Sequence, residues 1–125
     1  MVLENKRRQM RVRVMLAVEI YDILNDRYFV GKIVDISASG VALVTPEELV
    51  IQTPVSLTFT FEDAIYKNVP ADIVREEKKQ KEKYLGSAFF DLEPQARERL
   101  ENTIKKVHLD NLNGLRKETI YNIYR

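Results

Sequence analysis

Apolar residues alternate with polar ones along most of the first 90 positions, the period-two pattern of half-buried strands. The pattern is clearest where Val55, Leu57, Phe59 and Phe61 alternate with Ser56, Thr58 and Thr60. It predicts six strands, at residues 12–20, 28–36, 41–45, 55–61, 66–77 and 85–92. Short turns such as Asn25-Asp26 separate them. The pattern therefore favours a mainly β fold, a closed or nearly closed antiparallel barrel.

Individual residues modify this expectation. Gly31 predicts a bulge or a close approach of two backbones, and Gly40 is expected to take a positive φ in the turn it ends. Pro70 cannot donate to a strand ladder, so residues 66–77 are expected to form an edge or bulged strand. The run Glu76–Lys83 is highly charged and predicts a solvated hairpin tip.

The period changes after Leu92, and a C-terminal α-helix is expected to cap an open end of the barrel. Pro94 suits a first helical position, and one face carries Ala96, Leu100, Ile104 and Val107. Asn113-Gly114 predicts a stop or turn. The apolar content of residues 115–125 favours packing back on the barrel as a short helix, with contact to a partner as the alternative.

Composition indicates one ordinary soluble domain. The 125 residues are 45% apolar and 31% charged, and there is no cysteine for a disulfide or a thiolate site. No apolar run approaches the ~20 residues that span a bilayer, and the start does not resemble a signal peptide. A cytoplasmic location without membrane insertion is therefore expected.

Positive charge is concentrated at the N-terminus, although the net charge is only +1. Residues 1–13 hold five Lys/Arg against one Glu, while the rest of the chain holds 15 against 18. DNA binding normally needs a broader basic face, so this basic arm favours a small polyanion over a duplex.

Two polar motifs indicate which polyanion. Arg7 and Arg11 stand four residues apart, and the second motif, in Asp35-Ile36-Ser37-Ala38-Ser39-Gly40, contains a carboxylate, a hydroxyl and a glycine. A guanidinium grips a phosphate, or the O6/N7 edge of guanine, with two parallel hydrogen bonds, and a carboxylate accepts from the opposite edge of guanine. Together they describe a pocket for an anionic guanine nucleotide. The alternatives are a solvated basic tail and a serine or Asx turn that bonds only nearby backbone.

The order RxxxR, then D/N-x-S-x-x-G, then a hydrophobic strand, resembles the PilZ domain, a bacterial receptor module for cyclic di-GMP. The likeness continues through Gly40–Leu43 and Tyr84–Phe90 and covers roughly residues 5–107. It implies a basic arm at 1–13, a PilZ-like barrel with its capping helix at 12–107, and a C-terminal extension at 108–125.

The resemblance also implies roles for particular residues. Arg7 and Arg11 would grip guanine and phosphate, with Arg8 as a further phosphate contact and Asp35 on the guanine edge. The remaining expected ligand-binding residues are Ser37, Ala38, Ser39, Gly40 and Gly86. Ordering of the arm over the ligand would change one face of the barrel, to be recognised by an unidentified output protein in processes such as motility or biofilm formation.

Other functions receive less support. A nucleotide-independent adaptor in pilus or flagellar assembly is the main alternative, and a small barrel binding single-stranded RNA is the third. An enzyme is not expected, because His108 has no nucleophile or metal partner in motif spacing and Phe59, Phe61, Phe89 and Phe90 suit a core. No metal and no cofactor besides the ligand is expected. Ligand stoichiometry and homodimer formation are left open.

Overall fold

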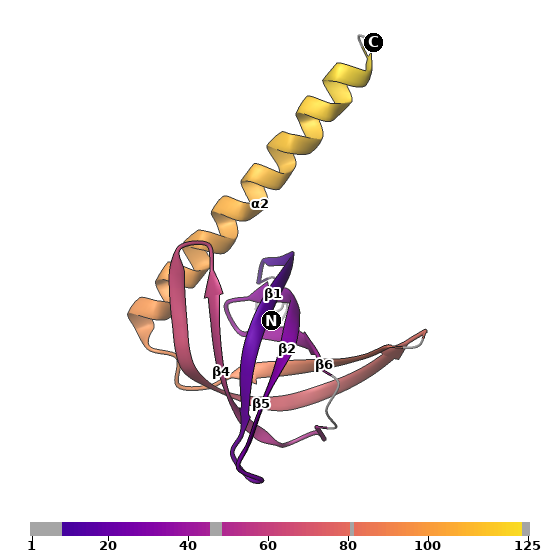
Figure 1. Ribbon diagram of the computed structural model, residues 1–125. Coiled ribbons are helices and arrows are strands. Elements are labelled where there is room, and N and C mark those ends of the chain that lie inside the picture. The colour runs from indigo at the N-terminus through magenta and orange to yellow at the C-terminus, as the bar shows by residue number, and fades with distance from the viewer. Residues whose placement is uncertain (1–8, 46–48, 81, 124–125) are drawn as a thin grey trace, which may run out of the picture.

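The computed structural model describes residues 9–45, 49–80 and 82–123, of which 115–123 are described by their backbone alone. These residues form six strands and one long helix (Figure 1). The elements are β1 (Arg11–Asp22), β2 (Arg27–Ser37), β3 (Gly40–Val44), β4 (Pro54–Phe61), β5 (Ala64–Lys79), β6 (Glu82–Phe89) and α2 (Pro94–Ile123).

The strands close into a barrel in the order β1-β2-β3-β6-β5-β4, with every neighbouring pair antiparallel. The predicted mainly β, six-stranded barrel is thus confirmed. Its interior is filled by the inward members of the alternating pattern, such as Ile20, Leu57 and Phe61, which are almost fully buried. Phe90 was wrongly placed in the core: it follows the end of β6 and is 43% exposed.

Pro70 does not mark a sheet edge, because β5 has a hydrogen-bonded neighbour on each side. It lies opposite Ser56 of β4, beside a register shift between Leu57 and Phe59. Asn68, with φ of 52°, lies in this irregular stretch. The bulged alternative is therefore correct and the edge alternative is wrong, although the bulge lies at Lys67 and Asn68, next to Pro70, and not at the proline itself.

Gly31 and Gly40 allow neighbouring strand backbones to approach each other closely. Gly40 does not take the predicted positive φ. Instead, a Cβ at this position would collide with the carbonyl oxygen of Ser87 on the neighbouring strand β6. A Cβ at Gly31 would lie 2.8 Å from the carbonyl oxygen of Val44, so close approach, rather than a bulge, explains that glycine too.

The charged run near residue 80 is mainly strand, contrary to the predicted loop. Glu76 to Lys79 continue β5 and pair with β6 down to the Lys79–Glu82 pair. These residues are exposed, as predicted. The β5–β6 hairpin therefore reaches beyond the barrel as a paired ribbon, visible in Figure 1.

Helix α2 begins at Pro94, as predicted, and covers one end of the barrel. Leu100 and Ile104 are buried in the barrel core. Arg97 Nη1 donates to the carbonyl oxygen of Ala38 at 3.4 Å, and the Arg99 guanidinium lies 5.3 Å from the centroid of the Tyr66 ring. The helix therefore contacts both the β2–β3 turn and the β4–β5 hairpin.

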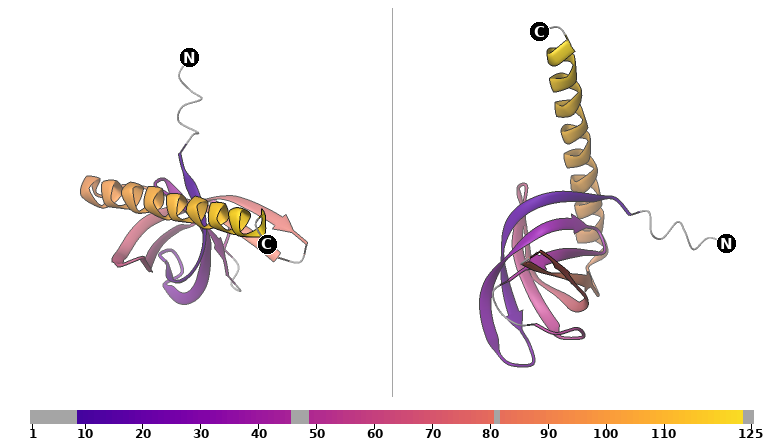
Figure 2. Two further views of the ribbon diagram at one scale, coloured as in Figure 1. Left: turned by 90° about the horizontal axis from the view of Figure 1, so that it is seen from above. Right: turned by 90° about the vertical axis from the view of Figure 1, so that its right-hand side faces the viewer.

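The end of α2 differs from the prediction. The helix passes through Asn113 and Gly114 and continues to Ile123, and its C-terminal half projects away from the barrel (Figures 1 and 2). Residues 115–123 therefore do not pack back on the barrel. A glycine inside an exposed helix costs only about 1 kcal/mol, and within the described chain nothing lies within 4 Å of a Cβ built at Gly114. The expected domain boundary at residue 107 falls inside this continuous helix and stays a prediction.

Candidate functional site

A row of five residues crosses five strands on the outer face of the barrel. Arg13 of β1 pairs with Asp35 of β2, which pairs with Ala42 of β3. Ala42 pairs with Gly86 of β6, and Gly86 pairs with Arg75 of β5. Directly opposed residues of antiparallel strands lie side by side. The row therefore places charged side chains on either side of a floor made by an alanine and a glycine.

A second row, parallel to the first, completes the site. It consists of Arg11, Ser37, Gly40 and Ala88, paired across β1, β2, β3 and β6. Between the two rows lies a pocket of about 180 Å³. Of the predicted ligand-binding residues, those that line it are Arg11, Asp35, Ser37, Ser39, Gly40 and Gly86. The fold thus brings together residues that are up to 75 positions apart in the sequence, from Arg11 to Gly86.

Three further residues were predicted to bind the ligand. Arg7 and Arg8 lie outside the described residues. Ala38 is buried and does not line the pocket; it borders a neighbouring hollow with Met10 and Ile104, between the start of β1 and α2. Arg11 itself belongs to β1 and not to a separate arm, so its backbone is held in the sheet.

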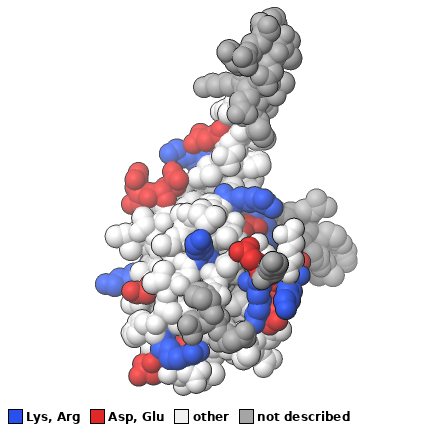
Figure 3. Space-filling model, turned by 45° about the vertical axis from the view of Figure 1, so that its right-hand side comes forward, with Lys and Arg blue, Asp and Glu red and all other residues white. Residues whose placement is uncertain are grey.

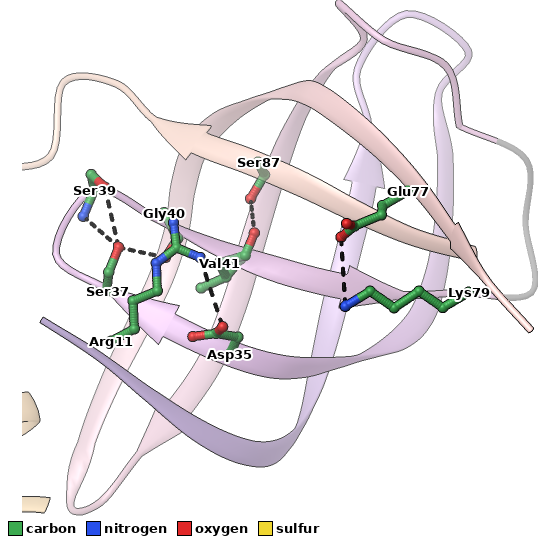
Figure 4. Close-up of polar contacts among 9 residues, drawn as sticks. All are labelled: Arg11, Asp35, Ser37, Ser39, Gly40, Val41, Glu77, Lys79 and Ser87. Carbon is green, nitrogen blue, oxygen red and sulfur yellow. Dashed lines mark hydrogen bonds and ion pairs between the residues drawn. The ribbon is translucent and has the colours of Figure 1, made fainter. Parts of the chain in front are cut away.

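Arg11 and Asp35 face each other at the pocket. Their nearest atoms, Arg11 Nη1 and Asp35 Oδ2, are 3.7 Å apart, and the side chains are 56% and 29% exposed. Figure 4 shows Arg11 between Asp35 and the turn that follows Ser37. At this exposure an ion pair contributes only about 0–1 kcal/mol. Both groups are therefore held near the pocket by a contact that a stronger partner can displace.

The turn from Ser37 to Gly40 is fixed by its own hydrogen bonds. Ser39 N donates to Ser37 Oγ at 3.2 Å, and Ser37 Oγ donates to the carbonyl oxygen of Gly40 at 3.3 Å. Ser37 thus makes the local contacts of a serine turn, the alternative raised by its motif. Phe89 N donates to Ser39 O at 2.8 Å, and Ser87 Oγ to Val41 O at 3.0 Å, which attaches the turn to β6 (Figure 4). The turn at the edge of the pocket is thus held by hydrogen bonds both within itself and to β6.

Arg75 lines the same pocket, and the sequence analysis missed it. The β5–β6 register shifts between Ile73 and Arg75, so that Val74 is an extra residue in β5. The Arg75 side chain lies over Gly86: a Cβ built on that glycine would be 3.1 Å from Arg75 Nη2 and 3.2 Å from Nε. In the sequence, Arg75 lies in the expected strand 66–77, just before the charged run Glu76–Lys83, and no motif indicates its role.

Two further properties of the described residues bear on function. No group of three His, Asp or Glu side chains among them is arranged to hold a metal ion. The described part of α2 is not apolar enough to cross a membrane.

Comparison with solved structures shows where this barrel recurs. YcgR from Escherichia coli in complex with c-di-GMP has a TM-score of 0.78 at 13% identity, over 90% of this chain and 50% of that one. The inhibitor of motility MotI/DgrA from Bacillus subtilis has a TM-score of 0.72 at 16% identity, over 83% and 52%. The PilZ domain of E. coli YcgR with c-di-GMP has a TM-score of 0.71 at 12% identity, over 90% and 98%.

This chain spans about half the length of the first two proteins and nearly the whole of the isolated PilZ domain. At these identities the likeness shows the fold alone. Among curated proteins, none matches the chain significantly. The sequence profile of the PilZ domain, however, matches residues 5–106, which is most of the chain. With that match and the closed six-stranded barrel, the chain belongs to the PilZ domain family, whose members are ligand-binding receptor modules.

Proposed function

We propose that this protein is a cyclic di-GMP receptor that passes its signal to a partner protein. The observation that carries the proposal is the pocket in which Arg11, Asp35 and Gly40 meet. It combines a guanidinium, a carboxylate and a floor without side chains, which is the set of groups that an anionic guanine nucleotide needs. Solved structures of the same fold, such as YcgR, contain c-di-GMP.

Each residue has a distinct part in this proposal. Arg11 donates to a phosphate or to O6/N7 of guanine, while Asp35 accepts from the N1–H and N2 donors on the opposite edge. Gly40 lets β3 lie close to the backbone of Ser87 on β6, and Gly86 leaves room for the Arg75 side chain beside the ligand. In this proposal Arg7 and Arg8, which lie outside the described residues, add cationic contacts to the ligand.

Binding requires Arg11 and Asp35 to exchange partners. Their mutual contact is long and partly exposed, whereas a hydrogen bond to a charged group contributes roughly 1.5–3 kcal/mol. The gain therefore exceeds the loss. Ordering the chain before β1 costs roughly 1–2 kcal/mol per residue, which limits the affinity to the micromolar range, about −8 kcal/mol.

The output runs through the turn beneath the ligand. Ala38 lies in this turn, and its carbonyl oxygen accepts from Arg97 of α2. Met10, just before β1, borders the same hollow as Ile104 of α2. A ligand that orders the arm and contacts the turn thus changes the surface between the barrel and the helix, which the partner protein recognises. Nothing in this scheme requires catalysis.

Calorimetry with purified protein tests the proposal, using GTP and cyclic AMP as competing ligands. Arg11→Ala and Asp35→Ala should each weaken c-di-GMP binding by about tenfold or more, equal to about 1.4 kcal/mol. Lys67→Ala, an exposed cation away from the pocket, is the matched control and should bind normally. Undiminished affinity in both pocket variants, or equal binding of GTP, would remove the assignment.

A further inference from the structure

We propose that a second anion-binding subsite, centred on Arg75, adjoins the pocket and holds a phosphate group and a base of the same nucleotide ligand. The β5 subsite, as we call it, consists of Arg13, Arg75, Lys79 and Tyr84. The inference rests on the proposed function for the identity of its ligand. None of these four residues belongs to either sequence motif.

The β5 subsite is hollow and continuous with the first pocket. A depression of about 430 Å³ is lined in part by these four residues and extends across the outer face of the barrel from β1 to β5. The residues that line both this depression and the first pocket are Arg11, Asp35, Ala42 and Arg75. A ligand in the first pocket that is longer than the pocket therefore extends directly over Arg75.

The lining of this depression is cationic. It contains Arg11, Arg13, Arg75 and Lys79 against Asp35 and Glu77. The two carboxylates already have basic neighbours, because Lys79 Nζ lies 3.8 Å from Glu77 Oε1 and Asp35 faces Arg11 (Figure 4). Within the described part of the chain, Arg13 and Arg75 form no ion pair. Figure 3 shows basic side chains gathered on the right of the barrel, with acidic ones among them.

The Arg75 side chain is exposed, but its guanidinium lies against the sheet at Gly86, where an anion can reach it. The extra residue Val74 turns it outward, and its guanidinium lies on the bare backbone of Gly86. A guanidinium that already rests on the sheet loses less conformational freedom when it binds, and its planar fork matches the oxygens of a phosphate. Arg13 approaches from the other end of the same row.

Tyr84 supplies an aromatic surface beside these cations. Its hydroxyl donates to Glu82 at 2.9 Å, which fixes the ring, and Lys79 Nζ lies 5.8 Å from the ring centroid. The hydrogen bond to Glu82 raises the pKa of Tyr84, and Arg13 lines the same depression as the ring. Stacking of a base on an aromatic side chain contributes about 1–3 kcal/mol. The β5 subsite thus offers both groups that a nucleotide requires.

Adjacent lysines of β5 give a matched test. Lys79 lines the depression and Lys78 does not, although both are exposed on the same ribbon. In titrations of the full chain with c-di-GMP, we expect Arg75→Ala and Lys79→Ala to weaken binding by about fivefold or more, equal to about 1 kcal/mol, and Lys78→Ala to leave it unchanged. Tyr84→Leu should also weaken binding. Melting temperatures close to the wild-type value establish that the variants are folded.

The outcomes separate this inference from the proposed function. If Arg11→Ala loses binding while Arg75→Ala and Lys79→Ala bind like Lys78→Ala, the β5 subsite is wrong and the first pocket stands. If the wild-type chain does not bind c-di-GMP, the proposed function is wrong. In that case guanosine monophosphate is the probe: a shift of the Arg75 side-chain NMR signal that Tyr84→Leu reduces supports the subsite, and its absence overturns it.

Discussion

The barrel contains two aspartate–arginine pairs that differ in almost every physical respect. Asp22, at the end of β1, is 1% exposed, and it accepts hydrogen bonds from Asn25 N, Asn25 Nδ2 and Arg27 Nη2 at 3.2, 2.9 and 3.1 Å. Asp35 is 29% exposed and faces Arg11 at 3.7 Å. Identical residue types therefore serve two purposes. The Asp22 carboxylate is satisfied within the fold, whereas Asp35, the carboxylate that we propose binds the ligand, has only a long contact with Arg11.

The position of each pair along β2 explains the difference. Asp22 and Arg27 enclose the tight β1–β2 turn, so the carboxylate bonds the turn that it begins. Asp35 lies at the other end of β2, on the row with the alanine and glycine floor. A carboxylate beside small residues has few protein donors within reach, and this leaves it available. In the proposed function, Asp35 can bind a ligand because the fold uses only part of the hydrogen-bonding capacity of its carboxylate.

The largest expected effect is on stability, from loss of the first pair. Asp22→Ala removes three hydrogen bonds to a buried carboxylate and leaves Asn25 N without its acceptor. We expect the free energy of unfolding to fall by about 2–4 kcal/mol, measured by urea denaturation. Binding of c-di-GMP by the folded fraction should not change. A stable Asp22→Ala protein would show that the two pairs are not different in kind.

Loss of the Arg11–Asp35 pair should weaken c-di-GMP binding but leave the stability of the fold almost unchanged. Asp35→Asn keeps the shape of the side chain but removes the charge, so c-di-GMP binding should weaken by about tenfold, equal to about 1.4 kcal/mol. The free energy of unfolding should change by less than about 0.5 kcal/mol, because the pair is long and partly exposed. Calorimetry and urea denaturation on the same preparation measure both quantities. A larger loss of stability than of affinity would contradict the comparison.

Acid should reveal the contribution of the Asp22 carboxylate to stability. Burial raises the pKa of Asp22, but the hydrogen bonds from Asn25 and Arg27 outweigh it and hold the pKa below its ordinary value of 3.8. A carboxyl with a lowered folded-state pKa stabilises the fold above its unfolded pKa, and this contribution is lost as the pH falls from about 3.8 through the folded pKa. The unfolding free energy of wild type should therefore fall over this range. Asp22→Asn should show a flatter dependence, and equal slopes for the two proteins would exclude this role.

The barrel and one of the two pairs were predicted from sequence, whereas the Asp22–Arg27 pair was not. Alternation of apolar and polar residues predicted the strands, and the two motifs predicted a site containing Arg11 and Asp35, which the fold brings together. Arg75 was not accessible, because the period-two pattern places it on the same face as the buried Ile73. The bulge at Val74 reverses that parity, and bulges are set by tertiary pairing rather than by local sequence.

The roles of Gly40 and Gly114 also could not be predicted from the sequence. Both glycines were assigned conformational roles, a turn with positive φ and a helix stop. The structure uses the first to avoid Ser87 and tolerates the second inside a helix. A glycine in a sequence indicates only that the backbone is conformationally free at that position. Whether a neighbouring backbone requires the absence of a Cβ, or an exposed helix merely accommodates the glycine, is seen only in the three-dimensional structure.

The smallest expected effect concerns the contact between α2 and the end of the barrel near Asp35. The end of the barrel near Asp35 touches α2 through the Arg97–Ala38 hydrogen bond, whose 3.4 Å length indicates a weak contact. Arg97→Ala should change c-di-GMP affinity by no more than about twofold, since Leu100 and Ile104 still hold the helix to the core. It should, however, reduce the ligand-induced NMR shifts of the exposed helix residues Leu109 and Leu112, with Lys106→Ala as a control on the same helix. Shifts of wild-type size in Arg97→Ala would mean that the signal reaches the helix by another route, such as the hollow between Met10 and Ile104.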